Sequence, residues 1–251
     1  MESITYELND SVGTLTINRA EKHNSLGGNE LQGLQQALDL IAADSEVRVL
    51  IITGAGDKTF CAGAALDELN SGRITPESFQ LTMQRVAELP IPTLARVNGN
   101  VFGGGTELAL GCDFRVGIEG TRLRVPAAAF GLCYPPAGIA RFVKTLGAST
   151  AKRMLVASET FTAEELYRIG FYDYLVPREK LDERVEELAL HMAGLAPLAM
   201  SAMKELIVQA ESGAIDIARA AELSRICDES ADLQEGFAAQ QEKRVPKFVG
   251  K

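Results

Sequence analysis

The stretch VNGNVFGGGTEL (residues 97–108) decides the fold, because three consecutive glycines link a predicted strand, Thr93–Val97, to a predicted helix, Thr106–Leu110. Small residues at the start of a helix leave backbone N–H groups free, and the helix dipole attracts negative charge to them. A second stretch, TFCAGAAL (residues 59–66), runs from a loop into a short helix in the same way. If the two helix starts face one point, their N–H groups form a pair of donors for an oxyanion; otherwise the glycines serve only tight turns.

Strands and helices alternate on both sides of this stretch. Short apolar or alternating runs predict strands at Ile4–Leu8, Val12–Asn18, Val47–Thr53, Phe114–Ile118 and Tyr172–Val176. Apolar spacings of three and four, with proline and glycine breaks, predict helices at 31–41, 76–89, 139–145 and 149–157. This alternation is typical of an α/β fold.

From about residue 178 the pattern is helical. One apolar seam contains Leu181, Val185, Leu188, Met192 and Leu195, and a second contains Met200, Met203 and Ile207. Such a tail either completes the core of its own chain or packs on a neighbouring subunit, and its several apolar faces favour the subunit contact. We therefore divide the chain into a core, residues 1–190, and a helical oligomerisation region, residues 191–251.

The composition excludes several classes of protein. Of 251 residues, 46% are hydrophobic and 24% are charged, which excludes a disordered chain, and a net charge of −9 disfavours nucleic-acid binding. Four scattered cysteines and two histidines form no metal-ligand pattern, so we predict no metal and a reducing compartment. The first residues, MESITYELND, contain no basic stretch followed by an apolar core, and no apolar run approaches the ~20 residues that a membrane helix needs. We therefore expect no signal peptide and a cytoplasmic protein without membrane contact.

An ordered set of motifs along the whole chain resembles the crotonase superfamily, also called the enoyl-CoA hydratase/isomerase family. These motifs are NR (18–19), NSL (24–26), FCAGA (60–64), VNG (97–99), GGGTELA (103–109), CD (112–113), FG (130–131), Gly138, APLA (196–199), EGF (235–237) and EKR (242–244). The resemblance implies a spiral of ββα repeats followed by helices that form a trimer or a dimer of trimers. It also implies an acyl-CoA thioester substrate, with no cofactor other than the coenzyme A that the substrate carries.

The resemblance assigns roles to individual residues. The backbone N–H groups of Ala64 and Gly104 would hold the thioester oxygen as it becomes an enolate, and Glu107 would transfer protons. Contacts with coenzyme A would come from Lys22, His23, Ala62, Leu66 and Lys243. Lys243 would pair with a phosphate of coenzyme A, often across a subunit boundary. Without the resemblance, we would interpret the basic residues at the end of the chain as exposed to solvent and without a binding role.

One catalytic position departs from the family pattern. Hydratases of this family carry a second glutamate directly after the proline that is Pro126 here, and this chain has Ala127 instead. A methyl group cannot transfer a proton, and the loss of a positioned acid or base typically costs about 10²–10⁴ in rate. Ala65 likewise replaces a usual aspartate. These departures favour a specialised reaction, or a protein that binds acyl-CoA without turnover.

A loop beyond this position is similar to that of methylmalonyl-CoA decarboxylase. The run GLCYPPAGI (131–139) shares its tyrosine, Tyr134, although the decarboxylase has His and Thr where this chain has Ala64 and Val125. Decarboxylation needs no base at carbon, because the departing CO₂ leaves its electron pair to the enolate. Tyr134 would orient the carboxylate or thioester, or simply line the acyl pocket together with Leu66, Phe79 and Leu132.

Three functions therefore remain open. The leading hypothesis is a lyase that works through a thioester enolate, with Glu107 as its remaining acid/base. The second is a methylmalonyl- or ethylmalonyl-CoA-type decarboxylase that uses the same N–H groups together with Tyr134. The third is a non-catalytic acyl-CoA-binding protein.

Overall fold

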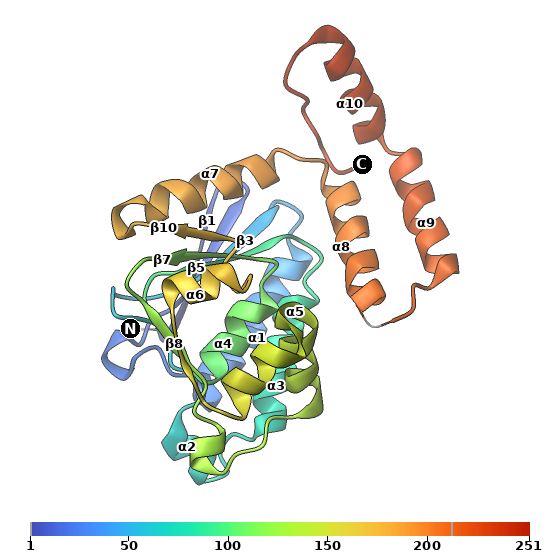
Figure 1. Cartoon of the computed structure of the whole chain (residues 1–251). Helices are drawn as coiled ribbons and strands as arrows, with labels where there is room; N and C mark the ends of the chain where they lie inside the picture. The colour runs from blue at the N-terminus through green and yellow to red at the C-terminus, as the bar shows by residue number, and fades with distance from the viewer. Residues whose placement is uncertain (1, 212) are drawn as a thin grey trace.

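A six-stranded sheet forms the frame of the N-terminal body in the computed structural model, which describes residues 2–211 and 213–251 (Figure 1). Its strands, in spatial order, are β1 (Ile4–Asn9), β2 (Val12–Ile17), β3 (Val49–Gly54), β5 (Thr93–Val97), β7 (Phe114–Ile118) and β10 (Tyr174–Val176). Strands β1 and β2 pair in antiparallel fashion, and each of the other pairs, β2–β3, β3–β5, β5–β7 and β7–β10, is parallel. The predicted strands are confirmed within two residues at each end.

A second, four-stranded sheet was not predicted from the sequence. It contains β4 (Thr59–Cys61), β6 (Asn100–Phe102), β8 (Arg122–Arg124) and β9 (Thr160–Thr162), in that order. The prediction of a loop at the start of residues 59–66 was therefore wrong. Strands of three residues are too short to show an alternating pattern.

The two sheets are built by repetition of one unit. A long strand of the first sheet leads to a short strand of the second sheet and then to a helix, as in β3–β4–α2, β5–β6–α4 and β7–β8–α5. This connectivity confirms the predicted spiral of ββα repeats.

Helices cover both faces of the six-stranded sheet. On one face lie α1 (Gly28–Ala43), α3 (Pro76–Ala87), α4 (Gly104–Gly111) and α5 (Pro136–Leu155) (Figure 1). Their apolar side chains form the larger core with the strands. On the other face lies α7 (Leu181–Ala193). Leu181, Val185 and Met192 pack there against β3, β5 and β7, so these members of the first predicted seam complete the core of their own chain.

The remaining helices are short. They are η1 (Ala20–Lys22), α2 (Leu66–Asn70), η2 (Ala128–Phe130), α6 (Ala163–Arg168) and η3 (Arg178–Lys180). The two helices predicted at 139–145 and 149–157 are the halves of α5, whose backbone leaves the helical conformation at Gly147, with φ 78°. The first half begins at Pro136, because proline suits the opening turn of a helix.

Three helices at the end of the chain form an arm that projects from the body (Figure 1). They are α8 (Pro197–Glu211), α9 (Ile217–Asp228) and α10 (Ala231–Glu242). Polar contacts join the arm to the body. Lys204 Nζ on α8 donates to Asp113 Oδ2 at 2.6 Å, and Arg48 of the body donates to the carbonyl oxygen of Phe248 at 2.6 Å. Apolar side chains remain on its surface, including Met203, Ile207 and Phe237, each more than half exposed.

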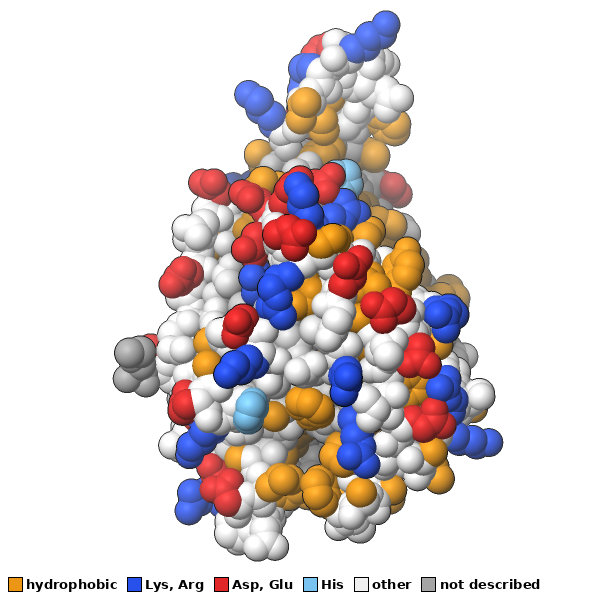
Figure 2. Space-filling view, turned by 60° about the vertical axis from the view of Figure 1, so that its left-hand side comes forward, with side chains coloured by type: hydrophobic (Ala, Val, Ile, Leu, Met, Phe, Trp, Pro, Cys, Tyr) orange, Lys and Arg blue, Asp and Glu red, His pale blue; other side chains and the backbone are white. Residues whose placement is uncertain are grey.

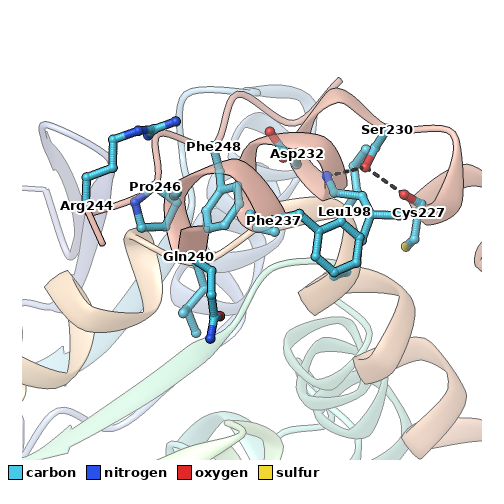
Figure 3. A pocket seen from close by; sticks show the side chains of 15 residues that line it. Leu198, Cys227, Ser230, Asp232, Phe237, Gln240, Arg244, Pro246 and Phe248 are labelled. Carbon is cyan, nitrogen blue, oxygen red and sulfur yellow. Dashed lines mark hydrogen bonds between the residues drawn. The ribbon is translucent and has the colours of Figure 1, made fainter. Parts of the chain in front are cut away.

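An apolar pocket of about 510 Å³ lies within the arm, between α8, α10 and the C-terminal segment (Figure 3). In the part of the chain that the structure describes, no helix has the length and apolar character needed to span a bilayer. Nor do three or more His, Cys, Asp or Glu side chains among the described residues gather in a way that could hold a metal ion.

Candidate active site

A second pocket, in the body, brings most of the predicted site residues together. It has a volume of about 500 Å³ and lies among α2, α4, η2 and the loop that precedes α5. In Figure 2, hydrophobic side chains surround a hollow in the lower part of the molecule, with Lys and Arg side chains near them. Its lining is formed by His23, Ala62, Ala64, Leu66, Leu69, Pro76, Phe79, Phe102, Gly103, Gly104, Glu107, Pro126, Ala127, Phe130, Leu132, Tyr134 and Pro135.

The two glycine-containing stretches meet backbone to backbone at this pocket. A Cβ atom at Gly63 would lie 2.3 Å from the amide nitrogen of Gly104, and a Cβ atom at Gly105 would lie 2.1 Å from the carbonyl oxygen of Cys61. Gly63 also has a φ of 79°, which disfavours any residue with a side chain. Only glycine allows the start of α4 to approach the loop after β4 this closely.

Ala64 and Gly104 line the pocket, where their backbone N–H groups are the predicted donors. The amide of Leu26 donates to the carbonyl of Gly63 at 2.8 Å, and the amide of Ala65 donates to the carbonyl of Leu26 at 2.9 Å, so the backbone on both sides of Ala64 is fixed. Within residues 2–211 and 213–251, neither the Ala64 amide nor the Gly104 amide donates a hydrogen bond. Helix α4 begins at Gly104, two residues before the predicted start, which places this N–H in the first turn.

Glu107 is the buried carboxyl of the site. It lies in the first turn of α4 with 2% of its surface exposed, and its Oε1 atom has no hydrogen-bond partner among the described residues. Burial raises the pKa of Glu107 to about 7, and the nearby positive charge of Arg141 partly opposes the increase. The carboxyl group therefore changes its protonation near neutral pH.

Tyr134 forms part of the same pocket wall. Its ring packs edge-on against Phe142, with centroids 5.9 Å apart. Burial raises the pKa of the Tyr134 phenol, and the negative charge of Glu107 raises it further. The phenol thus keeps its proton and can donate a hydrogen bond.

The position at which the family resemblance leads us to expect a second glutamate also lies in the pocket lining. Ala127 occupies it directly before η2, with 6% of its surface exposed. Phe79, Leu66 and Leu132 line the pocket as expected from the sequence. Glu107 is the only carboxylate among the lining residues.

The predicted coenzyme contacts fall into two groups. His23, Ala62 and Leu66 line the pocket, and the exposed Lys22 precedes His23 at the end of η1. Lys243 is exposed at the C-terminal end of α10, and Figure 1 shows α10 at the opposite end of the molecule from α2. A role for Lys243 at a pocket of this kind would therefore need a second copy of the chain.

Sequence reasoning missed two polar residues near Glu107. Gln80 is 6% exposed on α3, and its side-chain nitrogen and oxygen have no partner among the described residues; the same is true of Arg141 Nε. Gln80 stands between apolar neighbours of the α3 stripe, Phe79 and Met83, and this polar interruption is the signal that could have revealed it.

Comparison with known proteins gives a consistent match over the full chain. Residues 7–251 match the family model described as Enoyl-CoA hydratase/isomerase. The chain is 30% identical to crotonyl-CoA hydratase of Syntrophomonas wolfei subsp. wolfei, over 100% of this chain and 99% of that protein. It is 31% identical to 2,3-dehydroadipyl-CoA hydratase of Escherichia coli, over 94% of each.

Solved structures show the same architecture. The enoyl-CoA hydratase of Bacillus anthracis superposes with a TM-score of 0.89 at 32% identity, over 99% of this chain and 100% of that chain. An enoyl-CoA hydratase/carnithine racemase of Magnetospirillum magneticum gives a TM-score of 0.93 at 28% identity, over 100% of this chain and 97% of that one.

Proposed function

The chain belongs to the enoyl-CoA hydratase/isomerase (crotonase) family, and from that premise we propose that it is a lyase that acts on acyl-CoA thioesters through an enolate. Its curated relatives include hydratases of crotonyl-CoA and of 2,3-dehydroadipyl-CoA. A pocket of about 500 Å³ with an apolar wall and few polar groups suits an acyl chain with a reactive thioester.

The free N–H groups of Ala64 and Gly104 support an oxyanion hole. Both residues line the pocket, and the close approach of Gly63 to the Gly104 nitrogen holds the two segments together. When the thioester carbonyl becomes an enolate, charge grows on its oxygen, and fixed donors stabilise that charge more than they stabilise the substrate. One such donor is typically worth about 3–4 kcal/mol in the transition state.

The single observation that carries the proposal is the buried, unpartnered carboxyl of Glu107 in this pocket. A pKa of about 7 lets one group both accept and donate a proton at neutral pH. In hydration, the Glu107 carboxylate accepts a proton from water as the water oxygen adds to the β-carbon. The electron pair of the double bond moves to the thioester oxygen. Glu107 then delivers its proton to the α-carbon, and the enolate collapses to the thioester.

Decarboxylation is the second candidate, and the position of Tyr134 favours it. Its neutral phenol, in a pocket where Ala127 replaces a carboxyl, would hold the carboxylate of a malonyl-type thioester. The bond between the α-carbon and the carboxylate breaks, CO₂ leaves, and the electron pair forms the enolate in the same oxyanion hole. A proton must then reach the α-carbon, from Glu107 or from water.

We propose further that the arm joins copies of the chain into a trimer or a dimer of trimers, and that Lys243 of one copy binds a coenzyme A phosphate at a neighbour's pocket. The exposed apolar side chains Met203, Ile207 and Phe237 on the arm support this assembly. Light scattering at micromolar concentration tests it, and a stable monomer would contradict it.

A panel of thioesters tests the proposed reaction. The purified protein is incubated with crotonyl-, methylmalonyl- and ethylmalonyl-CoA, and hydration and CO₂ release are followed separately for the wild type and for Glu107→Gln. Hydration that depends on Glu107 supports the leading proposal. Release of CO₂ that is insensitive to Glu107→Gln favours the decarboxylase, and tight binding without turnover favours the non-catalytic binding protein.

A further inference from the structure

A small buried polar cluster lies beside the pocket and includes Glu107. Its members come from three helices: Gln80 from α3, Glu107 from α4 and Arg141 from α5. Gln80 Oε1, Gln80 Nε2, Glu107 Oε1 and Arg141 Nε are buried without a hydrogen-bond partner among the described residues. Buried polar groups are normally paired, so unpaired ones that lie together call for a functional explanation.

The main chain of α5 shows that Gln80 and Glu107 are close neighbours. A Cβ atom built on Gly138 would lie 3.0 Å from Gln80 Oε1 and 3.2 Å from Glu107 Oε1. It would also lie 3.3 Å from Cδ1 of Tyr134, which lines the pocket. The carboxamide and the carboxyl therefore flank one point, next to the candidate active site.

A carboxamide suits a carboxyl group that must gain and lose a proton. Its oxygen can accept a hydrogen bond from the protonated acid, and its NH₂ group can donate one to the carboxylate. Rotation of the amide plane exchanges the two atoms without a change of shape. A lysine or a second carboxylate at position 80 would favour only one protonation state.

We propose that Gln80 is a positioning residue for Glu107: a small rotation of its side chain brings the carboxamide into hydrogen-bond contact with the carboxyl group, which it then orients in both protonation states of the catalytic cycle. This inference rests on the proposed function only for its effect on turnover, because the two side chains are neighbours in the free protein. A hydrogen bond to the ionised form is the stronger of the two. Once this hydrogen bond forms, Gln80 favours the carboxylate and lowers the pKa of Glu107.

The other titratable groups around Glu107 come from the elements packed against α4. Arg141 of α5 lies near enough to oppose the effect of burial, and the phenol of Tyr134 stays neutral. On β4, burial raises the pKa of the Cys61 thiol to about 12, so it also stays neutral. Strand β6 carries no titratable side chain, and His23 lies in the pocket lining.

The test measures the titration of Glu107 directly, by NMR of protein labelled with ¹³C at the glutamate carboxyl carbons. The Glu107 signal is identified by its loss in Glu107→Gln. In Gln80→Met, which conserves length but removes both polar atoms, we expect the Glu107 pKa to rise by roughly one unit. From a starting value of about 7, such a rise lowers kcat at pH 7 roughly fivefold, because fewer molecules carry the carboxylate.

Two further readouts separate positioning from a merely structural role. KM changes little in Gln80→Met, and kcat recovers at higher pH as the carboxylate returns. Gln84→Met is the matched control: Gln84 is exposed one turn further along α3 and bonds Glu88 at 2.7 Å, so neither titration nor kcat changes. If Gln80→Met does not fold, Gln80→Leu gives the answer by the same titration, since it also fills the site and removes both polar atoms.

An unchanged Glu107 titration in a folded Gln80→Met or Gln80→Leu protein would overturn the inference, even if turnover fell. The proposed function fails in a different way: Glu107→Gln would then turn over thioesters as fast as the wild type. In that case the NMR titration still decides whether Gln80 positions Glu107.

Discussion

The body and the arm each contain a pocket of nearly the same volume, about 500 Å³ and about 510 Å³, but their buried polar groups differ. In the arm, Asp232 accepts hydrogen bonds from the amides of Val249 and Gly250 at 2.7 and 2.9 Å. Ser230 donates to the carbonyl of Cys227 at 2.7 Å (Figure 3). In the body, Glu107 Oε1 has no partner among the described residues. Satisfied polar groups maintain a structure, whereas unsatisfied ones are available to a substrate.

The largest expected effect is a difference in kcat between variants of the two pockets' carboxyl groups, Glu107 in the body and Asp232 in the arm. Glu107→Gln should lower kcat by about 10²–10⁴, because it removes the proposed acid/base. Asp232→Asn should leave kcat nearly unchanged and lower the free energy of unfolding by about 1–3 kcal/mol, because it weakens two hydrogen bonds to backbone amides. Steady-state kinetics and urea unfolding of both variants test this. Equal losses of kcat would remove the distinction between the pockets.

A second pair of variants compares one glycine from each pocket. A Cβ atom at Gly104 would lie 2.5 Å from the ring of Phe79, so Gly104→Ala must displace the ring or the N-terminal turn of α4. We expect kcat to fall up to about 10²-fold, since small shifts of catalytic groups cost that much.

In the arm, a Cβ atom at Gly236 would meet only the ring of Phe248, at 3.7 Å, which is an ordinary contact. Gly236→Ala, inside α10, should raise the free energy of unfolding by about 0.5–1 kcal/mol with kcat unchanged. A loss of activity in this variant, measured beside Gly104→Ala, would show that the arm pocket takes part in the reaction.

A smaller effect concerns pH and stability. Burial raises the pKa of Glu107 from 4.5 to about 7, so the folded state binds the proton more tightly than the unfolded state. The resulting stabilisation is complete below pH 4.5 and is lost as the pH rises through 7. The glutamine in Glu107→Gln does not titrate, so the variant does not lose stability in this way as the pH rises. Its free energy of unfolding should exceed that of the wild type by roughly 1–3 kcal/mol at pH 8 and by much less near pH 5. Urea unfolding at both pH values measures the difference; the same gain at both would contradict the assignment.

The sequence predicted one pocket better than the other, for physical reasons. The body pocket depends on the close approach of Gly63 and Gly104. Each of these glycines lies in a motif of consecutive residues, so each motif can be recognised from the sequence. The sequence did not predict Gln80 as a site residue, because its side chain becomes buried only when α4 and α5 pack against α3. The short strands β4, β6, β8 and β9 were missed because three residues show no period. The arm pocket forms because the C-terminal segment folds back along α10, and no local sequence pattern predicts that path.

The central claim is that the main-chain N–H groups of Ala64 and Gly104 hold the same thioester oxygen. A crystal structure of Glu107→Gln with an intact acyl-CoA tests it most directly. The account predicts the thioester oxygen in the body pocket, about 2.7–3.1 Å from both amide nitrogens. An oxygen that contacts neither amide, or an acyl group bound in the arm pocket instead, would contradict it.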